Sequence, residues 1–60
     1  METPREKCAM RAAERMADQD GQKALGPNWN WRAYWQAYWR NFWSHYWQAY
    51  NAAPCRNMAG

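Results

Sequence analysis

The 60-residue sequence contains no valine or isoleucine and only one leucine, Leu25. Because β-branched aliphatic residues favour strands, their absence argues against a β-sheet core. The chain also has a single histidine, a single serine and a single threonine, so side chains that act as acids, bases and nucleophiles are scarce. We therefore expect a non-enzymatic, all-α protein with no catalytic residues, no metal and no cofactor.

Charge is present at an ordinary level and with little bias. Charged residues make up 22% of the chain, and the formal net charge is +3 at pH 7. A mildly basic chain with dispersed lysine and arginine is a weak indication of nucleic-acid binding. The N-terminal residues are charged and lead into no apolar segment, so we expect no secretory signal and a cytoplasmic protein.

Aromatic residues are abundant: six tryptophans, four tyrosines and one phenylalanine. After residue 30 they recur every four residues as adjacent pairs. Residues four apart are neighbours on a helix, whereas on a strand each pair would be split between opposite faces. The sequence therefore predicts a helix with two adjacent rows. We call them the tryptophan row, Trp31, Trp35, Trp39, Trp43 and Trp47, and the tyrosine row, Tyr34, Tyr38, Phe42, Tyr46 and Tyr50.

A helix is also predicted over residues 4–25, before the aromatic segment. Thr3 and Glu6 form a capping box around a proline at the first helical position. Gly21 is one candidate for the helix end, but two acidic residues just before it would be unfavourable at a helix C-terminus. The Gly26-Pro27 pair, a strong terminator, favours the longer helix.

The second helix is predicted over residues 29–52, after a turn at 26–28, with Asn28 or Asn30 as its cap. A proline at position 54 ends it, and residues 53–60 are expected to form a short irregular tail. The fold class expected is thus an all-α hairpin, a single small unit that covers the whole chain.

The two aromatic rows are predicted to exceed what the hairpin can cover. A four-residue step advances about 40° beyond a full helical turn, so the band winds, and a straight neighbouring helix would meet only part of it. The first helix offers small and soft side chains: Cys8, Ala9, Met10, Ala12, Ala13, Met16 and Ala17. We expect roughly half of the band to stay exposed, above the ~400 Å² that a monomer tolerates easily.

The predicted function is therefore structural. A second copy, in an oligomer or filament, or a larger protein complex would cover the remaining aromatic surface. Arg32 and Arg40 are interleaved with the aromatic rows and, like tryptophan and tyrosine, are typical of binding hot spots. A buried Trp39 at the centre of the ladder is expected to contribute strongly to folding or assembly.

Two other functions remain open. The first is membrane binding. The aromatic helix is long enough to span a bilayer, but each tetrad has a polar residue and Arg40 lies near its middle, which argues against spanning. Binding along a membrane surface is the alternative that we retain. Single-stranded nucleic acid is the weaker alternative, with bases stacked on the rings. Lys7, Arg11 and Arg15 form a basic stripe that suits phosphate, although neighbouring acidic residues suggest local ion pairs instead.

Three remaining side chains carry specific expectations. Cys8 and Cys55 lie near opposite ends of the chain, at different distances from the turn, so two reduced thiols are favoured over a disulfide, which stays an alternative. A zinc site is not expected, because only one histidine accompanies them. His45 is expected to be a hydrogen-bonded residue at the helix contact rather than a ligand of haem or a pigment.

Overall fold

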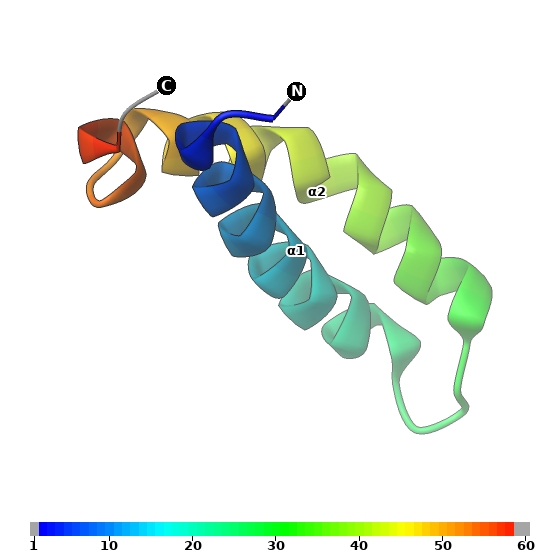
Figure 1. Cartoon of the computed structure of the whole chain (residues 1–60). Coiled ribbons are helices and arrows are strands. Elements are labelled where there is room, and N and C mark those ends of the chain that lie inside the picture. The colour runs from blue at the N-terminus through cyan, green and yellow to red at the C-terminus, as the bar shows by residue number, and fades with distance from the viewer. Residues whose placement is uncertain (1, 59–60) are drawn as a thin grey trace.

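A computed structural model describes residues 2–58 as two antiparallel helices joined by a short turn (Figure 1). Helix α1 spans Pro4–Leu25 and helix α2 spans Trp31–Asn51, followed by a single 3-10 turn, η1, at Cys55–Asn57. Residues 2–58 include no strand. The predicted all-α hairpin is confirmed, with α2 starting two residues later and ending one residue earlier than expected. Residues 59 and 60 of the predicted tail lie outside the described residues.

The helix ends are fixed by the side chains that flank them. Thr3 Oγ1 accepts a hydrogen bond from the backbone N–H of Glu6 at 3.1 Å, as the capping box predicts. Gly26 follows α1 with a φ of 67°, a conformation that glycine adopts without strain. Asn30, the later of the two candidate caps, accepts from the backbone N–H of Ala33 at 3.1 Å. The turn therefore spans residues 26–30 instead of 26–28.

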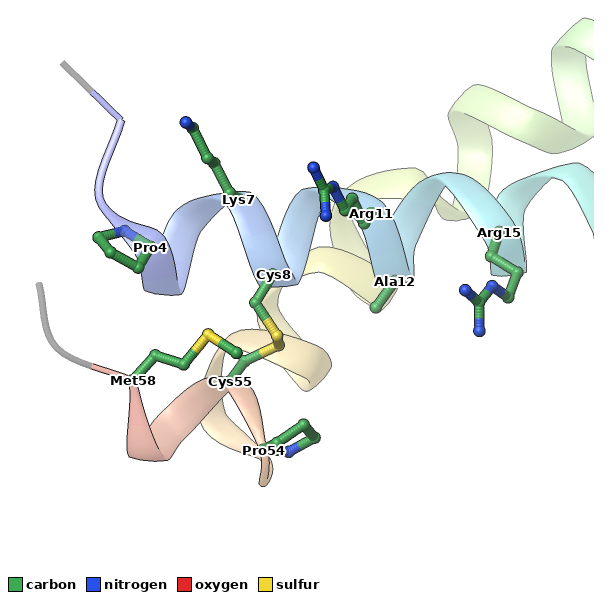
Figure 2. Close-up of a pocket in the computed structure, with 9 residues that line it drawn as sticks. All are labelled: Pro4, Lys7, Cys8, Arg11, Ala12, Arg15, Pro54, Cys55 and Met58. Atoms are coloured by element: carbon green, nitrogen blue, oxygen red, sulfur yellow. A yellow bond between two sulfur atoms is a disulfide. The ribbon is translucent and has the colours of Figure 1, made fainter.

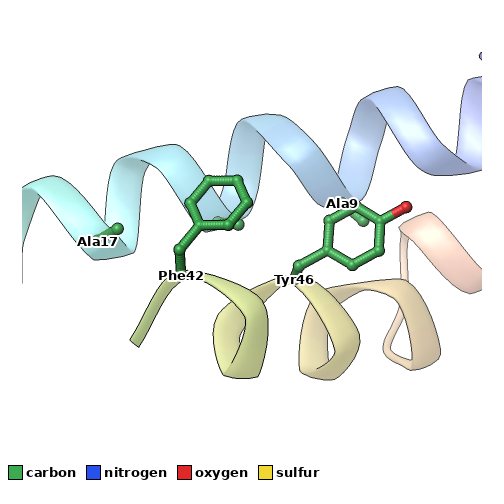
Figure 3. Close-up of a cluster of buried hydrophobic side chains, with 5 residues drawn as sticks. Ala9, Ala17, Phe42 and Tyr46 are labelled. Carbon is green, nitrogen blue, oxygen red and sulfur yellow. The ribbon is translucent and has the colours of Figure 1, made fainter. Parts of the chain in front are cut away.

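The core lies between the helices and consists of one row from each. Figure 3 shows the rings of Phe42 and Tyr46 projecting from α2 toward alanines of α1. Phe42 is 2% exposed and Tyr46 is 8% exposed, and Tyr38 and Tyr50 pack against the same cluster. The α1 side of the core is a stripe of small or aliphatic residues at every fourth position, all buried: Ala9, Ala13, Ala17, Gly21 and Leu25.

The helix contact follows the tyrosine row from Tyr34 to Tyr50 and leaves the tryptophan row exposed, so it covers only part of the band, as expected. The contact follows one whole row instead of crossing both rows at one point. The small-residue stripe of α1 also recurs every four residues, so both rows rotate around their helices at the same rate and stay together. Met16 is 43% exposed and does not join this stripe. The four-residue pattern thus specifies one continuous contact.

Gly21 lies inside α1 because of this contact. A Cβ atom at this position would be 2.6 Å from two ring atoms of Tyr34. The aromatic ring therefore occupies space that any other residue would need. The longer of the two predicted helices is confirmed, and the glycine serves close packing instead of ending the helix.

Candidate interaction surface

The tryptophan row lies outside the core. Each of its five members is between 50 and 55% exposed, and Trp29 in the turn is 68% exposed. Trp39 is 55% exposed, so it does not belong to the core of the hairpin, and its expected contribution to assembly stays a prediction. The two rows are one residue apart, which is about 100° around a helix, and α1 is wide enough to cover only the tyrosine row.

Contacts within α2 hold the exposed indoles in place. Along the helix, each tryptophan from Trp35 to Trp47 packs against the tyrosine-row residue before it, with ring centroids 4.8 to 5.1 Å apart and planes 74 to 89° apart. This edge-to-face geometry is favourable for aromatic pairs. The tryptophan row is therefore an ordered surface supported by the buried row beneath it.

Carboxylates of α1 line the same side of the hairpin. The hydroxyl of Tyr34 donates a hydrogen bond to Asp18 Oδ1. This bond, together with burial, raises the pKa of Tyr34 to about 12. Burial also raises the pKa of Tyr38 and Tyr46, and nearby negative charge on α1 adds to it. The charges of Glu6, Glu14 and Asp18 act on these hydroxyls, and we call these three residues the acidic row. The acidic row and the tryptophan row together form what we call the tryptophan face.

The opposite side of the hairpin carries the histidine contact. His45 Nε2 lies 2.7 Å from Asp20 Oδ2, which joins α2 to α1. The expectation of a hydrogen-bonded histidine at the helix contact is confirmed. At the open end, the Arg5 guanidinium lies 3.9 Å from the centroid of the Tyr50 ring, and its Nε donates to the Tyr50 carbonyl oxygen at 2.9 Å.

The predicted arginines of the interaction set lie away from the tryptophan face. Arg32 and Arg40 are exposed, and each lies two residues before a buried tyrosine-row residue, about 160° from the side that meets α1. They therefore occupy the back of α2. The structure does not bring their guanidinium groups into one cluster with the exposed indoles.

A second set of cations occupies the back of α1. Lys7, Arg11 and Arg15 are exposed and are offset by two residues from the buried alanine stripe. Within residues 2–58 no lysine or arginine lies within 4.0 Å of a carboxylate, so the expected local ion pairs with acidic neighbours do not form. We call these three cations the basic row.

The two cysteines form a disulfide, with their Cα atoms 5.4 Å apart. The favoured expectation of two reduced thiols is thus wrong. It assumed that Cys55 would continue away from the turn, whereas the chain folds back after α2. The backbone N–H of Arg56 donates to the Ala52 carbonyl oxygen at 2.9 Å, and that of Met58 donates to the Cys55 carbonyl oxygen at 3.0 Å. This turn brings Cys55 beside the first half of α1.

The returning tail and α1 enclose a groove, with a cavity volume of about 500 Å³. Figure 2 shows the disulfide at its centre, with the tail on one side and the basic row along α1 on the other. Its apolar walls come from Ala12, Pro54, Met58 and the disulfide. This groove could not be predicted from the sequence, because it depends on the fold-back of the tail. The four-residue spacing of the basic row was its only visible sign.

Neither metal-binding nor membrane-spanning features accompany these surfaces. Within residues 2–58, histidine, cysteine, aspartate and glutamate form no group of three placed to hold a metal ion. In the same range, neither long helix has an apolar stretch sufficient to cross a bilayer. Comparisons with protein-family models, with curated proteins and with solved structures find no match to this chain.

Proposed function

We propose that this chain is a non-enzymatic assembly subunit whose tryptophan row binds a protein surface, foremost that of a second copy of itself. The observation that carries the proposal is the half-exposure of five indoles in one ordered row. At up to ~250 Å² per ring, half-exposure leaves on the order of 600 Å² of aromatic surface. Even the largest apolar patch on a typical monomer is roughly 300–600 Å².

The size of this surface supports a protein partner. A standard interface covers about 800 Å² on each side, and its energetic centre is enriched in tryptophan, tyrosine and arginine. The tryptophan row with its flanking carboxylates is close to that size, on a chain whose whole accessible surface is 4654 Å². A second copy is the partner that is always present. A site in a larger protein complex would use the same row.

Sedimentation of the oxidised chain over a range of concentrations tests the proposal. We expect the wild type to assemble and the variant Trp35→Gln/Trp39→Gln/Trp43→Gln to sediment as a folded monomer. The matched control, Gln36→Ala/Gln48→Ala, changes exposed residues on the back of the same helix and should assemble like the wild type. A wild-type monomer at every concentration, with indoles open to a quencher, would overturn self-assembly.

Lipid and nucleic acid fit the surface less well. The acidic row lies beside the tryptophan row, so anionic lipid headgroups or phosphates approaching the indoles would meet carboxylates. Arg32 and Arg40, which would hold phosphates, lie on the back of α2. Flotation of the chain with vesicles and salt-dependent binding to single-stranded oligonucleotides would each reveal the corresponding alternative.

The compartment expected from the sequence remains a prediction. Disulfides persist mainly in oxidising compartments, so the Cys8–Cys55 bond counts against the cytoplasmic location expected above. Assembly assays on the oxidised chain therefore keep the covalent state that the structure has.

A further inference from the structure

We infer that the tryptophan face binds the basic row and its groove on a second copy, so that copies join head to tail. The inference rests on the proposed function and identifies the surface that the tryptophan row would meet. Three properties of the described residues carry it: the character of the groove, the charges on the two surfaces, and their common spacing.

The groove offers an environment suited to an indole ring. Its walls are apolar, from Ala12, Pro54, Met58 and the disulfide, and its volume of about 500 Å³ lies within the range of small-ligand clefts, roughly 300–1,000 Å³. Lys7, Arg11 and Arg15 line the α1 side. A cation beside an aromatic face is attractive, and methionine sulfur also packs favourably on rings.

The charges of the two surfaces are complementary. The tryptophan face places Glu6, Glu14 and Asp18 beside its indoles, whereas the groove has three cations along one wall. Within residues 2–58 none of these cations is in an ion pair. A second copy would pair the acidic row with the basic row while the indoles enter the groove. Two tryptophan faces brought together would instead oppose like charges, which costs binding energy.

The spacing of the two surfaces also agrees. The basic row steps by four residues along α1, and the tryptophan row steps by four residues along α2. Both steps therefore rise about 6 Å along a helix axis. Three successive cations then match three successive indoles over about 12 Å. A regular helical match of this kind allows each cation to lie beside one ring.

The two surfaces cannot meet within one copy. The basic row lies on the back of α1, opposite its buried alanine stripe, and the tryptophan row lies on a side of α2. Contact between unlike surfaces is heterologous, so each added copy leaves one surface of each kind unoccupied. Unless the rotation between copies closes a ring, the product is an open chain of subunits.

Complementation between two variants tests this arrangement. The basic-row variant, Lys7→Gln/Arg11→Gln/Arg15→Gln, keeps the tryptophan face, and the tryptophan-row variant, Trp35→Gln/Trp39→Gln/Trp43→Gln, keeps the groove. At a concentration at which the wild type is assembled, we expect each oxidised variant alone to be monomeric. An equimolar mixture should form a 1:1 dimer that grows no further, because its two outer surfaces are both altered.

The outcomes separate the inference from the proposed function. Assembly of the basic-row variant like the wild type would overturn the inference and leave self-assembly through another contact, such as tryptophan row to tryptophan row. A mixture that stays monomeric would overturn it as well. A monomeric wild type would overturn the proposed function and the inference together. Circular dichroism and intact disulfides must first show that both variants are folded.

A matched charge control completes the test. Arg32→Gln/Arg40→Gln removes two cations from the back of α2 and leaves the groove unchanged. We expect this variant to assemble like the wild type and raised salt to weaken assembly, because exposed charge pairs are screened. Loss of assembly in this control, with the basic-row variant unaffected, would place the contact on α2 and contradict the inference.

Discussion

The two aromatic rows of α2 differ by one residue in position and have opposite environments. The tyrosine row packs on the alanine stripe of α1, where Phe42 is 2% exposed, whereas its neighbour Trp43 is 54% exposed. Both rows share the same period and similar chemistry. The difference shows that the small residues of α1, recurring every four positions, select which row is buried.

Ring size explains the selection in part. The rings of the tyrosine row fit against alanine and glycine, and at Gly21 even one methyl group would collide with Tyr34. The larger indoles remain at the side, where they pack edge-to-face on the buried rings. One row therefore holds the hairpin together, and the other is left to bind.

Truncating one member of each row should separate these roles most clearly. Phe42→Ala removes a buried ring and should lower the free energy of unfolding by about 3–5 kcal/mol. Trp43→Ala should cost at most about 1.5 kcal/mol, because it loses mainly an edge-to-face contact. Denaturant unfolding at low protein concentration measures both effects. The milder Phe42→Leu keeps the comparison measurable if the alanine variant fails to fold, and equal costs at the two positions would contradict it.

Removing the disulfide should show how much of the free energy of unfolding comes from the helix contact alone. The variant Cys8→Ser/Cys55→Ser removes a covalent link between two residues that are 47 positions apart in the sequence. In the chain-entropy model this should lower the free energy of unfolding by about 4 kcal/mol. Thermal unfolding of the variant and of the reduced wild type should agree. A variant as stable as the oxidised protein would mean that the helix contact needs no covalent closure.

Gly21→Ala probes the tightest point of the buried row. Overpacking against Tyr34 should cost about 1–3 kcal/mol, and the higher helix propensity of alanine should return up to about 1 kcal/mol. A net loss of stability is therefore expected in chemical denaturation. In a Tyr34→Leu background the loss should shrink or reverse, because the ring is gone. Gln22→Ala, an exposed neighbour, is the control and should be close to neutral.

Alkaline titration should give the smallest effect. The folded-state pKa of Tyr34 is about 12, above the unfolded value of about 10, so folding favours the protonated phenol. Its stabilisation is complete below pH 10 and is lost as the pH rises through 12. Unfolding measured across this range should show that the free energy of unfolding falls as the pH rises. In Tyr34→Phe this fall should be smaller. An unchanged profile in that variant would mean that other groups cause the loss.

Local signals in the sequence predicted most of the fold. Thr3 and Glu6 fixed the start of α1, and Gly26 fixed its end, because capping and backbone conformation depend on neighbouring residues. The period of four predicted α2 and its two rows. For His45 the sequence predicted a hydrogen bond but not its partner, because only the contact between the helices brings Asp20 close to it.

The features that the sequence did not reveal depend on contacts between distant residues. Both rows of α2 are aromatic, so their own residues could not show which one packs on α1. The alanines at positions 9, 13 and 17 with Gly21 held that information. The disulfide was missed because helix lengths alone separate Cys8 from Cys55, and the fold-back after α2 depends on the tail.

The shared period of the two helices sets a rule for changes in chain length. Adding one tetrad to α1 and one to α2 would extend the hairpin by about 6 Å and leave every row in line. A single added residue in α2 would rotate the residues that follow it by about 100°, which would move the tyrosine row off the alanine stripe and put the residues just before it, such as Asn41 and His45, in its place. Insertions and deletions compatible with this scaffold should therefore come in matched multiples of four, and the binding face would lengthen in the same steps.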